Sequence, residues 1–300
     1  GFIGLSGSLP RELGLLSDLE DVSLIWDDGN ARIGGTLPET LSNWARLEFL
    51  SLRGQNVTGP LSSSLTRAWE NLSVIDFTGN SFTGPLPEDL GSLPMVRTLI
   101  LSSNLFSGSI PASFGSTTAR RLHLHDNRLD GSLPPGVAPN LRDLDLSDNQ
   151  LTSLSALSEW RAPSLYSLVA DNNLLAGNLP TALQQSTPVL RRISLHSNKF
   201  QGSIPDSLST LMQLEYVDVS SNELSGAVPS GLTALASLKS LLVHNNDITS
   251  INCENSQNIP VREWYADCLA VDGAPAEVEC TCCSHCCSDA ANECQVQPFT

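Results

Sequence analysis

The chain has 300 residues, of which 40% are hydrophobic, and it carries a formal net charge of −16. This acidic excess disfavours nucleic-acid phosphates and acidic membrane surfaces as general partners. No apolar run approaches the ~18 residues that a membrane-spanning helix needs, so we expect no membrane span in this chain. No signal peptide is visible, which leads us to expect a mature chain or a fragment.

One asparagine recurs at intervals of about 24 residues, a spacing that predicts a solenoid of stacked coils. Each Asn closes a block such as 141-LRDLDLSDNQL-151, and in most blocks a Gly-x-Ile/Leu/Val-Pro segment follows. Within a block, apolar residues alternate as they do in a half-buried strand. Gln55 stands in the same register one period before the recurring positions, which are Asn80, Asn104, Asn127, Asn149, Asn173, Asn198, Asn222 and Asn246.

These asparagines are predicted to form a structural ladder. Each short carboxamide lies where the chain bends away from a strand, and it can pair with backbone groups that the bend would otherwise leave buried and unsatisfied. Apolar residues after the Asn then return to the interior along the rest of the coil. No single coil can bury that apolar face alone, so we expect about 10 or 11 stacked coils over residues 1–251.

The repeat L-x-x-L-x-L-x-x-N-x-L-x-G-x-I-P-x-x-L-x-x-L resembles the extracellular leucine-rich repeats of plant receptors and polygalacturonase inhibitors. The resemblance covers roughly residues 5–251. It implies an α/β solenoid, mostly parallel β-structure with short 3-10 or helical return segments, wound into a right-handed curved superhelix. Departures from the pattern lie in the insertion at 25–32, at Ser62 in place of Pro, and at 151–160, which lacks Gly-x-Ile-Pro. We expect the twist to falter at these places.

The first residues, 1-GFIGLSGSLPREL-13, read as the middle of a coil and lack the paired-cysteine cap that usually starts plant-type ectodomains. A terminal coil needs a covered outer face. Truncation, an upstream domain or a neighbouring molecule could each account for this end. The third explanation predicts head-to-tail contacts between identical subunits, which generate filaments when they do not close.

Two sequons, Asn56-Val57-Thr58 and Asn71-Leu72-Ser73, fall at outward positions of their coils. They make Asn56 and Asn71 candidate glycosylation sites of a secreted or cell-surface protein.

The predicted concave face carries a basic stripe through the middle coils of an otherwise acidic chain. The residue after the first Leu of successive blocks reads Glu20, Glu48, Ser73, Arg97, Arg120, Arg142, Tyr166, Arg191, Glu215 and Lys239. Arg121 and Arg192 widen the stripe, and His123, His125, His196, His244 and Tyr216 project from the same predicted surface. The candidate ligand-binding residues are therefore Arg97, Arg120, Arg121, His123, His125, Arg142, Tyr166, Arg191, Arg192, His196 and Tyr216.

Two interpretations of the stripe stay open. In the first, forked guanidinium contacts hold an anionic ligand, such as a uronic or sulfated polysaccharide or an acidic peptide. In the second, Asp126, Asp143, Asp145 and Asp148 pair with the arginines as a solvated ladder, each exposed pair contributing ~0 to 1 kcal/mol.

The sequence predicts neither a metal site nor catalysis. His123 and His125 point to one side of a strand, but no third ligand lies near them in the predicted coils, and no dense loop of oxygen ligands suits calcium. No cofactor motif appears. Pairs such as Ser147 with His125, or Ser194 with His196, lack the water-excluding pocket that a nucleophile needs.

All the cysteines gather in the last part of the chain, which predicts a separate, disulfide-rich C-terminal cap over residues 252–300. Connectivity is open, because eight cysteines allow on the order of 100 pairings. A metal site at Cys282-Cys283-Ser284-His285-Cys286-Cys287 is the alternative, but adjacent cysteines ligate one zinc ion poorly and an extracellular setting favours disulfides. The Trp-x-x-Asp-Cys lead-in ending at Cys268 resembles caps of secreted leucine-rich proteins from diatom-like algae. The cysteines are Cys253, Cys268, Cys280, Cys282, Cys283, Cys286, Cys287 and Cys294.

Two functions follow as hypotheses. The resemblance implies a non-enzymatic extracellular recognition module that binds a protein or an anionic glycan on its concave face. The alternative is a structural protein whose units assemble head to tail into an extracellular fibre or matrix.

Overall fold

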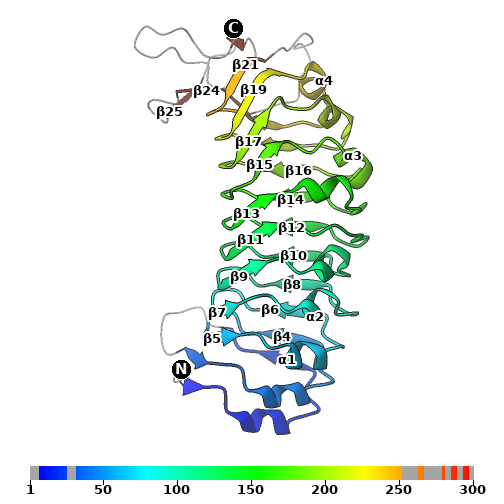
Figure 1. The fold of residues 1–300 in the computed structure, drawn as a ribbon, viewed down its shortest axis with the longest axis vertical. Coiled ribbons are helices and arrows are strands. Elements are labelled where there is room, and N and C mark those ends of the chain that lie inside the picture. The colour runs from blue at the N-terminus through cyan, green and yellow to red at the C-terminus, as the bar shows by residue number, and fades with distance from the viewer. Residues whose placement is uncertain are drawn as a thin grey trace. The chain divides into compact units, whose positions relative to one another are not determined.

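The computed structural model describes residues 7–25, 32–251, 263–266, 279–280, 285–288 and 293–296. The chain divides into two compact units: unit 1 comprises residues 1–151 and 159–162, and unit 2 comprises residues 152–158 and 163–300. Within each unit, the strands of successive coils lie side by side and the short helices follow one another along the coils (Figure 1).

Most coils contain a first strand, a turn that ends at a ladder Asn, a second strand and a short helical return. The return between β11 (Arg128–Ser132) and β12 (Asp143–Asp145) has no helix. We call the sheet of first strands the primary sheet and the sheet of second strands the secondary sheet. In one coil, β8 (Thr98–Ile100) precedes β9 (Leu105–Ser109) and the 3-10 helix η3 (Ala112–Ser116). Leu99 is buried between the half-buried Thr98 and Ile100, so alternation along the strand sends every second side chain into the core.

In unit 1 both sheets are parallel. The primary sheet contains β2 (Asp21–Ser23), β4 (Phe49–Ser51), β6 (Val74–Asp76), β8, β10 (Arg121–His123) and β12 (Asp143–Asp145). The secondary sheet contains β1 (Gly7–Ser8), β3 (Ile33–Gly35), β5 (Asn56–Pro60), β7 (Ser81–Gly84), β9 and β11 (Arg128–Ser132), and β13 (Gln150–Ser153) lies at the division between the units. The other returns are η1 (Arg11–Leu15), η2 (Glu39–Asn43), α1 (Ser63–Ala68) and α2 (Glu88–Gly91).

Unit 2 repeats the plan. Its primary strands are β14 (Ser167–Val169), β16 (Arg192–Ser194), β18 (Tyr216–Asp218), β20 (Ser240–Leu242), β22 (Glu263–Ala266), β24 (His285–Ser288) and β25 (Glu293–Val296). Its secondary strands are β15 (Ala176–Asn178), β17 (Lys199–Gly202), β19 (Glu223–Val228), β21 (Asp247–Ile251) and β23 (Glu279–Cys280). The returns are η4 (Ser155–Ser158), α3 (Leu183–Ser186), η5 (Asp206–Thr210) and α4 (Ser230–Thr233).

The ladder carboxamide of most coils connects its own coil to the preceding one. Asn104 Oδ1 accepts from the backbone N of Phe82 at 3.1 Å, and Asn104 Nδ2 donates to the carbonyls of Phe77, Leu101 and Ser102 at 2.9, 3.1 and 3.1 Å. One side chain thus satisfies four backbone groups that the bend would leave unpaired. The same contacts recur at Asn80, Asn127, Asn149, Asn198, Asn222 and Asn246, while Gln55 and Asn173 make related ones.

The residue before many of these asparagines has a positive φ, close to 54°, at positions such as Asp126, Asp148 and Ser221. This left-handed backbone is uncommon for L-residues other than Gly and is most easily adopted by short polar side chains. The bend therefore explains why Ser, Asp or Asn precedes the ladder position in these coils.

Aromatic side chains fill the core of unit 1. Phe77 stacks on Phe82 with ring centroids 5.1 Å apart, and Phe82 stacks on Phe106 at 5.8 Å. The buried indoles of Trp69 and Trp160 donate their N–H to the carbonyls of Leu41 and Gly115 at 3.2 and 2.9 Å. Each large ring therefore buries apolar area without leaving its polar atom unpaired.

Most return helices begin after a proline, whose missing N–H costs nothing at the first turn. Ser62 stands at the corresponding position before α1, and its Oγ accepts from the backbone N of Leu65 at 3.4 Å. The departure from the repeat pattern at Ser62 thus replaces a proline start with a side-chain cap.

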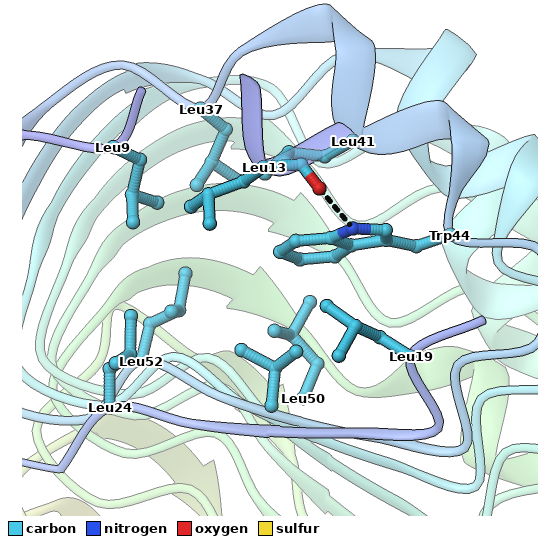
Figure 2. Close-up of a pocket in the computed structure, with 10 residues that line it drawn as sticks. Leu9, Leu13, Leu19, Leu24, Leu37, Leu41, Trp44, Leu50 and Leu52 are labelled. Carbon is cyan, nitrogen blue, oxygen red and sulfur yellow. Dashed lines mark hydrogen bonds between the residues drawn. The ribbon is translucent and has the colours of Figure 1, made fainter. Parts of the chain in front are cut away.

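A cavity of about 100 Å³ lies inside the first coils of unit 1 (Figure 2). Trp44 Nε1 donates to the carbonyl of Leu13 at 3.0 Å, as the dashed line in Figure 2 shows. The lining side chains are apolar, so the cavity offers no group that would orient a polar ligand. They belong to Leu9, Leu13, Leu19, Val22, Leu24, Leu37, Leu41, Trp44, Leu50 and Leu52.

Most of the predicted cysteine-rich cap falls outside the described residues, as do residues 26–31 of the predicted insertion. Cys253, Cys268, Cys282 and Cys283 lie outside them, and Cys280, Cys286, Cys287 and Cys294 belong to β23, β24 and β25. Strands β22 and β24 extend the primary sheet of unit 2 in parallel, and β25 pairs with β24 in antiparallel fashion. The disulfides, the boundary at 251/252 and the superhelical curvature stay predictions.

Candidate functional site

The residue immediately before each primary strand forms what we call the leading column. In unit 1 it includes Arg97, Arg120 and Arg142, which we call the arginine row. Arg120 N donates to the carbonyl of Arg97 at 2.7 Å, and Arg142 N donates to the carbonyl of Arg120 at 2.8 Å. These backbone bonds place the three residues on neighbouring strands, ~4.8 Å apart.

All three guanidinium groups of the arginine row are exposed. In the part of the chain that the structure describes, none of them has a hydrogen-bond or ion-pair partner. Like charges on neighbouring strands repel, by roughly 0.2–1 kcal/mol per pair. The row therefore does not stabilise the unit, and its charge is available to a ligand.

The aspartates that could have neutralised the row contact histidines instead. His123 Nε2 lies 3.0 Å from Asp143 Oδ2, and His125 Nδ1 lies 3.1 Å from Asp145 Oδ2. Arg121 Nε contacts Asp143 at 3.7 Å. The predicted charge ladder thus forms with Arg121 and the histidines but leaves the arginine row out.

His125 and Asp145 shift each other's titration. The hydrogen bond to Asp145 raises the pKa of His125 above 6.5, despite an opposing effect of burial. Burial alone would raise the pKa of Asp145, but hydrogen bonds from His125 and Ser147 outweigh it and hold that pKa below 3.8. The pair therefore favours its ionised form.

In the leading column of unit 2, the cationic side chains have ion-pair partners. Arg191 Nη1 lies 3.2 Å from Glu215 Oε1, and Lys239 Nζ contacts the other oxygen of Glu215. The hydrogen bond from Lys239, with the charges of Lys239 and Arg191, lowers the pKa of Glu215. One carboxylate thus neutralises much of the field of both cations. Tyr166, in the same column, is 43% exposed.

Beside this column, the Arg192 guanidinium lies 4.0 Å from the centre of the Tyr216 ring. The Tyr216 hydroxyl donates to Asp218 Oδ2 at 3.1 Å, and burial followed by the charge of Asp218 raises the pKa of Tyr216 to about 12. Arg192 thus has a cation–π partner within unit 2.

Asp171 and His196 meet on the same sheet. Asp171 accepts from Ser194 Oγ and from the backbone N of His196, both at 2.9 Å, and its Oδ2 lies 3.6 Å from His196 Nε2. Burial raises the pKa of Asp171 above 3.8 although its partners oppose the shift. The sequence marked Asp143 and Asp145 only as possible partners of arginines. It did not mark Asp171, Asp218 and Glu215 as charge partners, because these pairings depend on the strand register.

The two serines that the sequence placed beside the histidines do not donate to them. Ser147 Oγ donates to Asp145, and Ser194 Oγ donates to Asp171, rather than to a histidine. Ser102 Oγ and Asp145 Oδ2 both contact Nδ1 of His125, whereas a catalytic relay uses the two ring nitrogens separately. Within the described ranges, no group of three or more His, Cys, Asp or Glu side chains is placed to hold a metal ion.

Both sequon asparagines are exposed. Asn71 Nδ2 donates to the carbonyl of Ala45 at 2.7 Å, and Asn56 begins β5. Their glycosylation stays a prediction.

Two family models described as leucine-rich repeat match the chain, one over residues 188–248 and the other over 71–93, 95–117 and 140–160. Receptor-like protein 18 of Arabidopsis thaliana is 31% identical over 195 residues, which are 65% of this chain and 20% of that protein. Receptor-like protein 53 of the same plant is 31% identical over 60% of this chain and 21% of its own length. The chain thus spans about one fifth of these relatives.

Solved structures share the fold. PEPR1 with AtPEP1 superposes with a TM-score of 0.68 and 30% identity, covering 88% of this chain and 41% of that one. The Arabidopsis receptor kinase HAESA, solved with the peptide hormone IDA and the co-receptor SERK1, gives 0.63 and 27%, with 88% and 49% covered. A plant ice-binding protein gives 0.64 and 25%, with 87% and 80% covered. Together with the repeat matches and the carboxamide ladder, these likenesses show that the chain folds as a leucine-rich repeat solenoid similar to those of plant receptor-like proteins.

Proposed function

We propose that this chain is a non-enzymatic extracellular binding module that holds an extended anionic ligand, most favourably an acidic peptide, over the arginine row. The observation that carries the proposal is the absence of any partner for Arg97, Arg120 and Arg142 in the described part of an acidic protein. An extracellular setting agrees with the two sequons and with the plant receptor-like relatives.

The geometry suits a linear ligand. Three guanidinium groups follow one another at ~4.8 Å, and each presents forked N–H donors to a carboxylate. The underlying backbone is fixed by the sheet, so within the protein only the arginine side chains lose conformational freedom on binding. Charge-assisted hydrogen bonds of this kind contribute roughly 1.5–3 kcal/mol when shielded, and less at an exposed face.

Two of the structural neighbours were solved as complexes, and one of these complexes is named for a peptide ligand. PEPR1 was solved with AtPEP1, and HAESA with a peptide hormone. This similarity supports a peptide as the ligand of this chain, rather than the anionic polysaccharide that the sequence also allowed.

The non-enzymatic part of the proposal rests on the surroundings of the row. The cavity in unit 1 is lined by apolar side chains only, and Ser147 and Ser194, the serines that the sequence placed beside His125 and His196, donate to aspartates. In the ranges that the structure describes, no helix is long and apolar enough to cross a membrane.

The direct test measures binding of a fluorescent oligoglutamate peptide to the wild type and to the double variant Arg120→Ala/Arg142→Ala. We expect at least about a tenfold loss of affinity, and wild-type binding that weakens as salt rises, because exposed charge pairs are screened. The control is Arg128→Ala/Arg161→Ala, which removes the same charge from exposed positions of unit 1 outside the row. Unchanged binding in the first variant, or an equal loss in the control, contradicts the proposal.

Head-to-tail assembly is a second candidate, favoured by exposed apolar side chains on the first coils. Leu15, Leu16 and Ile25 are 79%, 52% and 52% exposed. If this surface joins identical subunits, the elution volume in size-exclusion chromatography falls with rising concentration, and Leu15→Ser/Leu16→Ser removes that dependence. A monomer at every concentration rules assembly out.

A further inference from the structure

We infer that the ligand of the arginine row is a peptide of mixed charge, with acidic residues over Arg97, Arg120 and Arg142 and a basic residue over Glu48. The inference rests on the proposed function, because it assigns the order of charges in the same ligand. It makes Glu48 a specificity-determining residue.

Glu48 belongs to the same leading column as the arginine row. Ser73 N donates to the carbonyl of Glu48 at 2.8 Å, and Arg97 N donates to the carbonyl of Ser73 at 2.8 Å. Glu48 therefore lies two strands before Arg97, or ~9.6 Å at the usual strand separation. One ligand that follows the column meets the carboxylate, then a neutral serine, then the three guanidinium groups.

Glu48 is exposed and has no side-chain hydrogen bond or ion pair in the described part of the chain. The preceding member of the column, Glu20, differs, because Arg46 Nη2 contacts it at 3.2 Å while Arg46 Nη1 contacts Asp18 at 3.4 Å. Arg46 thus pairs with Glu20 and Asp18, and Glu48 is left to face a ligand.

The charge order discriminates between ligand classes. A uniform polyanion that follows the row onto β4 meets Glu48 and is repelled, by roughly 0.2–1 kcal/mol at exposed sites. A lysine or arginine at the same place gains a similar amount. A polysaccharide with one acidic group per unit cannot reverse its sign, whereas a peptide can.

The spacing sets the sequence of such a peptide. An extended chain rises ~3.3 Å per residue, so ~9.6 Å corresponds to about three residues. The basic residue is therefore expected about three positions from the first acidic one. The acidic residues occupy about three or four further positions over the arginine row.

The experiment compares two end-blocked peptides of identical composition by fluorescence anisotropy. In the ordered peptide one lysine is followed by two serines and three glutamates, and in the isomer the lysine lies among the glutamates. We expect the wild type to bind the ordered peptide about threefold more tightly, an effect of the size of one exposed charge pair. Glu48→Gln should remove this preference without weakening an all-glutamate peptide.

The matched control is Glu70→Gln, which neutralises an exposed carboxylate of unit 1 outside the leading column. It should keep the preference. If both isomers bind the wild type equally and Arg120→Ala/Arg142→Ala weakens both, the charge order is wrong while the proposed function stands. If neither peptide binds, both fail. A preference that survives Glu48→Gln, or binding of polygalacturonate alone, also overturns the inference.

Discussion

The same column of the coil carries free cations in unit 1 and paired cations in unit 2. Arg97, Arg120 and Arg142 have no partners in the described part of the chain, whereas Arg191 and Lys239 share Glu215. The backbone does not cause this difference, because the same interstrand bonds position both sets. A repeated scaffold therefore fixes where charges lie, and single substitutions in the column decide whether the cations of a coil have ion-pair partners.

Substitutions in the asparagine ladder test whether the scaffold is equivalent in both units. They have the largest expected effect on stability. Asn104→Ala in unit 1 and Asn198→Ala in unit 2 each leave four backbone groups without their carboxamide partner. We expect each to lower the free energy of unfolding by about 3 to 5 kcal/mol, measured by urea denaturation.

The control for the ladder is Asn140→Ala, at an exposed position with no side-chain bond in the described ranges. It should change stability by less than about 0.5 kcal/mol. A cost below about 1 kcal/mol for either ladder variant would contradict the role assigned to the carboxamides.

Ser73→Glu places a carboxylate in the leading column of unit 1, next to a cation, as Glu215 does in unit 2. Arg97 N bonds to the carbonyl of Ser73, so the new carboxylate lies one strand from Arg97, as Glu215 does from Arg191. We expect acidic-peptide affinity to fall about five- to tenfold, since one cation is neutralised and the ligand meets a new negative charge. Ser132→Glu, an equal charge change at an exposed position on β11, should leave affinity within about twofold.

Glu215→Gln makes the opposite change. It frees Arg191 and Lys239, so unit 2 should gain affinity for oligoglutamate by about two- to fivefold, with stability altered by less than about 1 kcal/mol because the ion pairs are exposed. Calorimetry on the wild type and the variant measures the change. Asp247→Asn, elsewhere on unit 2, gives the same net charge. An equal gain there would show that only total charge matters.

The pH dependence of His125 gives the smallest effect. Its folded pKa lies above 6.5, so its contribution to stability is complete below pH 6.5 and is lost as pH rises through the folded value. Asp145, whose folded pKa lies below 3.8, contributes above pH 3.8 and loses this as pH falls. The cost of His125→Gln should therefore peak between pH 3.8 and 6.5, at less than about 1 kcal/mol given its partial exposure.

Asp171 of unit 2 should show the same direction of pH dependence as His125, and the opposite direction to Asp145, because its folded pKa is also raised. Its folded pKa lies above 3.8, so its contribution falls as pH rises through that value, and Asp171→Asn should become less damaging toward neutral pH. Urea midpoints of both variants at pH 4, 5, 6 and 8 test this. A cost of Asp171→Asn that rises with pH, or a cost of His125→Gln that does not fall between pH 6 and pH 8, would contradict the assigned shifts.

The architecture followed from sequence because a buried carboxamide at a fixed interval has few structural explanations. Residues such as Leu99 and Leu144 could be placed inside by alternation alone, and both are fully buried. The charge partners could not be assigned this way. Asp143 and Asp145 lie next to Arg142 in the chain, yet they contact His123 and His125 on the neighbouring strand.

Segment 151–160 shows a second feature that could not be predicted from the sequence. Its missing Gly-x-Ile-Pro was visible, but not that Trp160 would be buried with its N–H on the carbonyl of Gly115, 45 residues earlier. Such a contact depends on how coils pack over one another. Glu48 was equally inconspicuous, because its significance lies in the lack of a partner rather than in any motif.

Because most ladder carboxamides span two coils, the stack has a natural unit of growth. Duplication or loss of one whole period leaves every amide facing an equivalent backbone group, whereas a shift of one residue misplaces all four of its bonds. Genes for such proteins can thus gain or lose whole repeats while the hydrogen bonds between the remaining coils are preserved. The number of coils, and with it the length of the sheet surface, can therefore change independently of the charged residues that each coil carries.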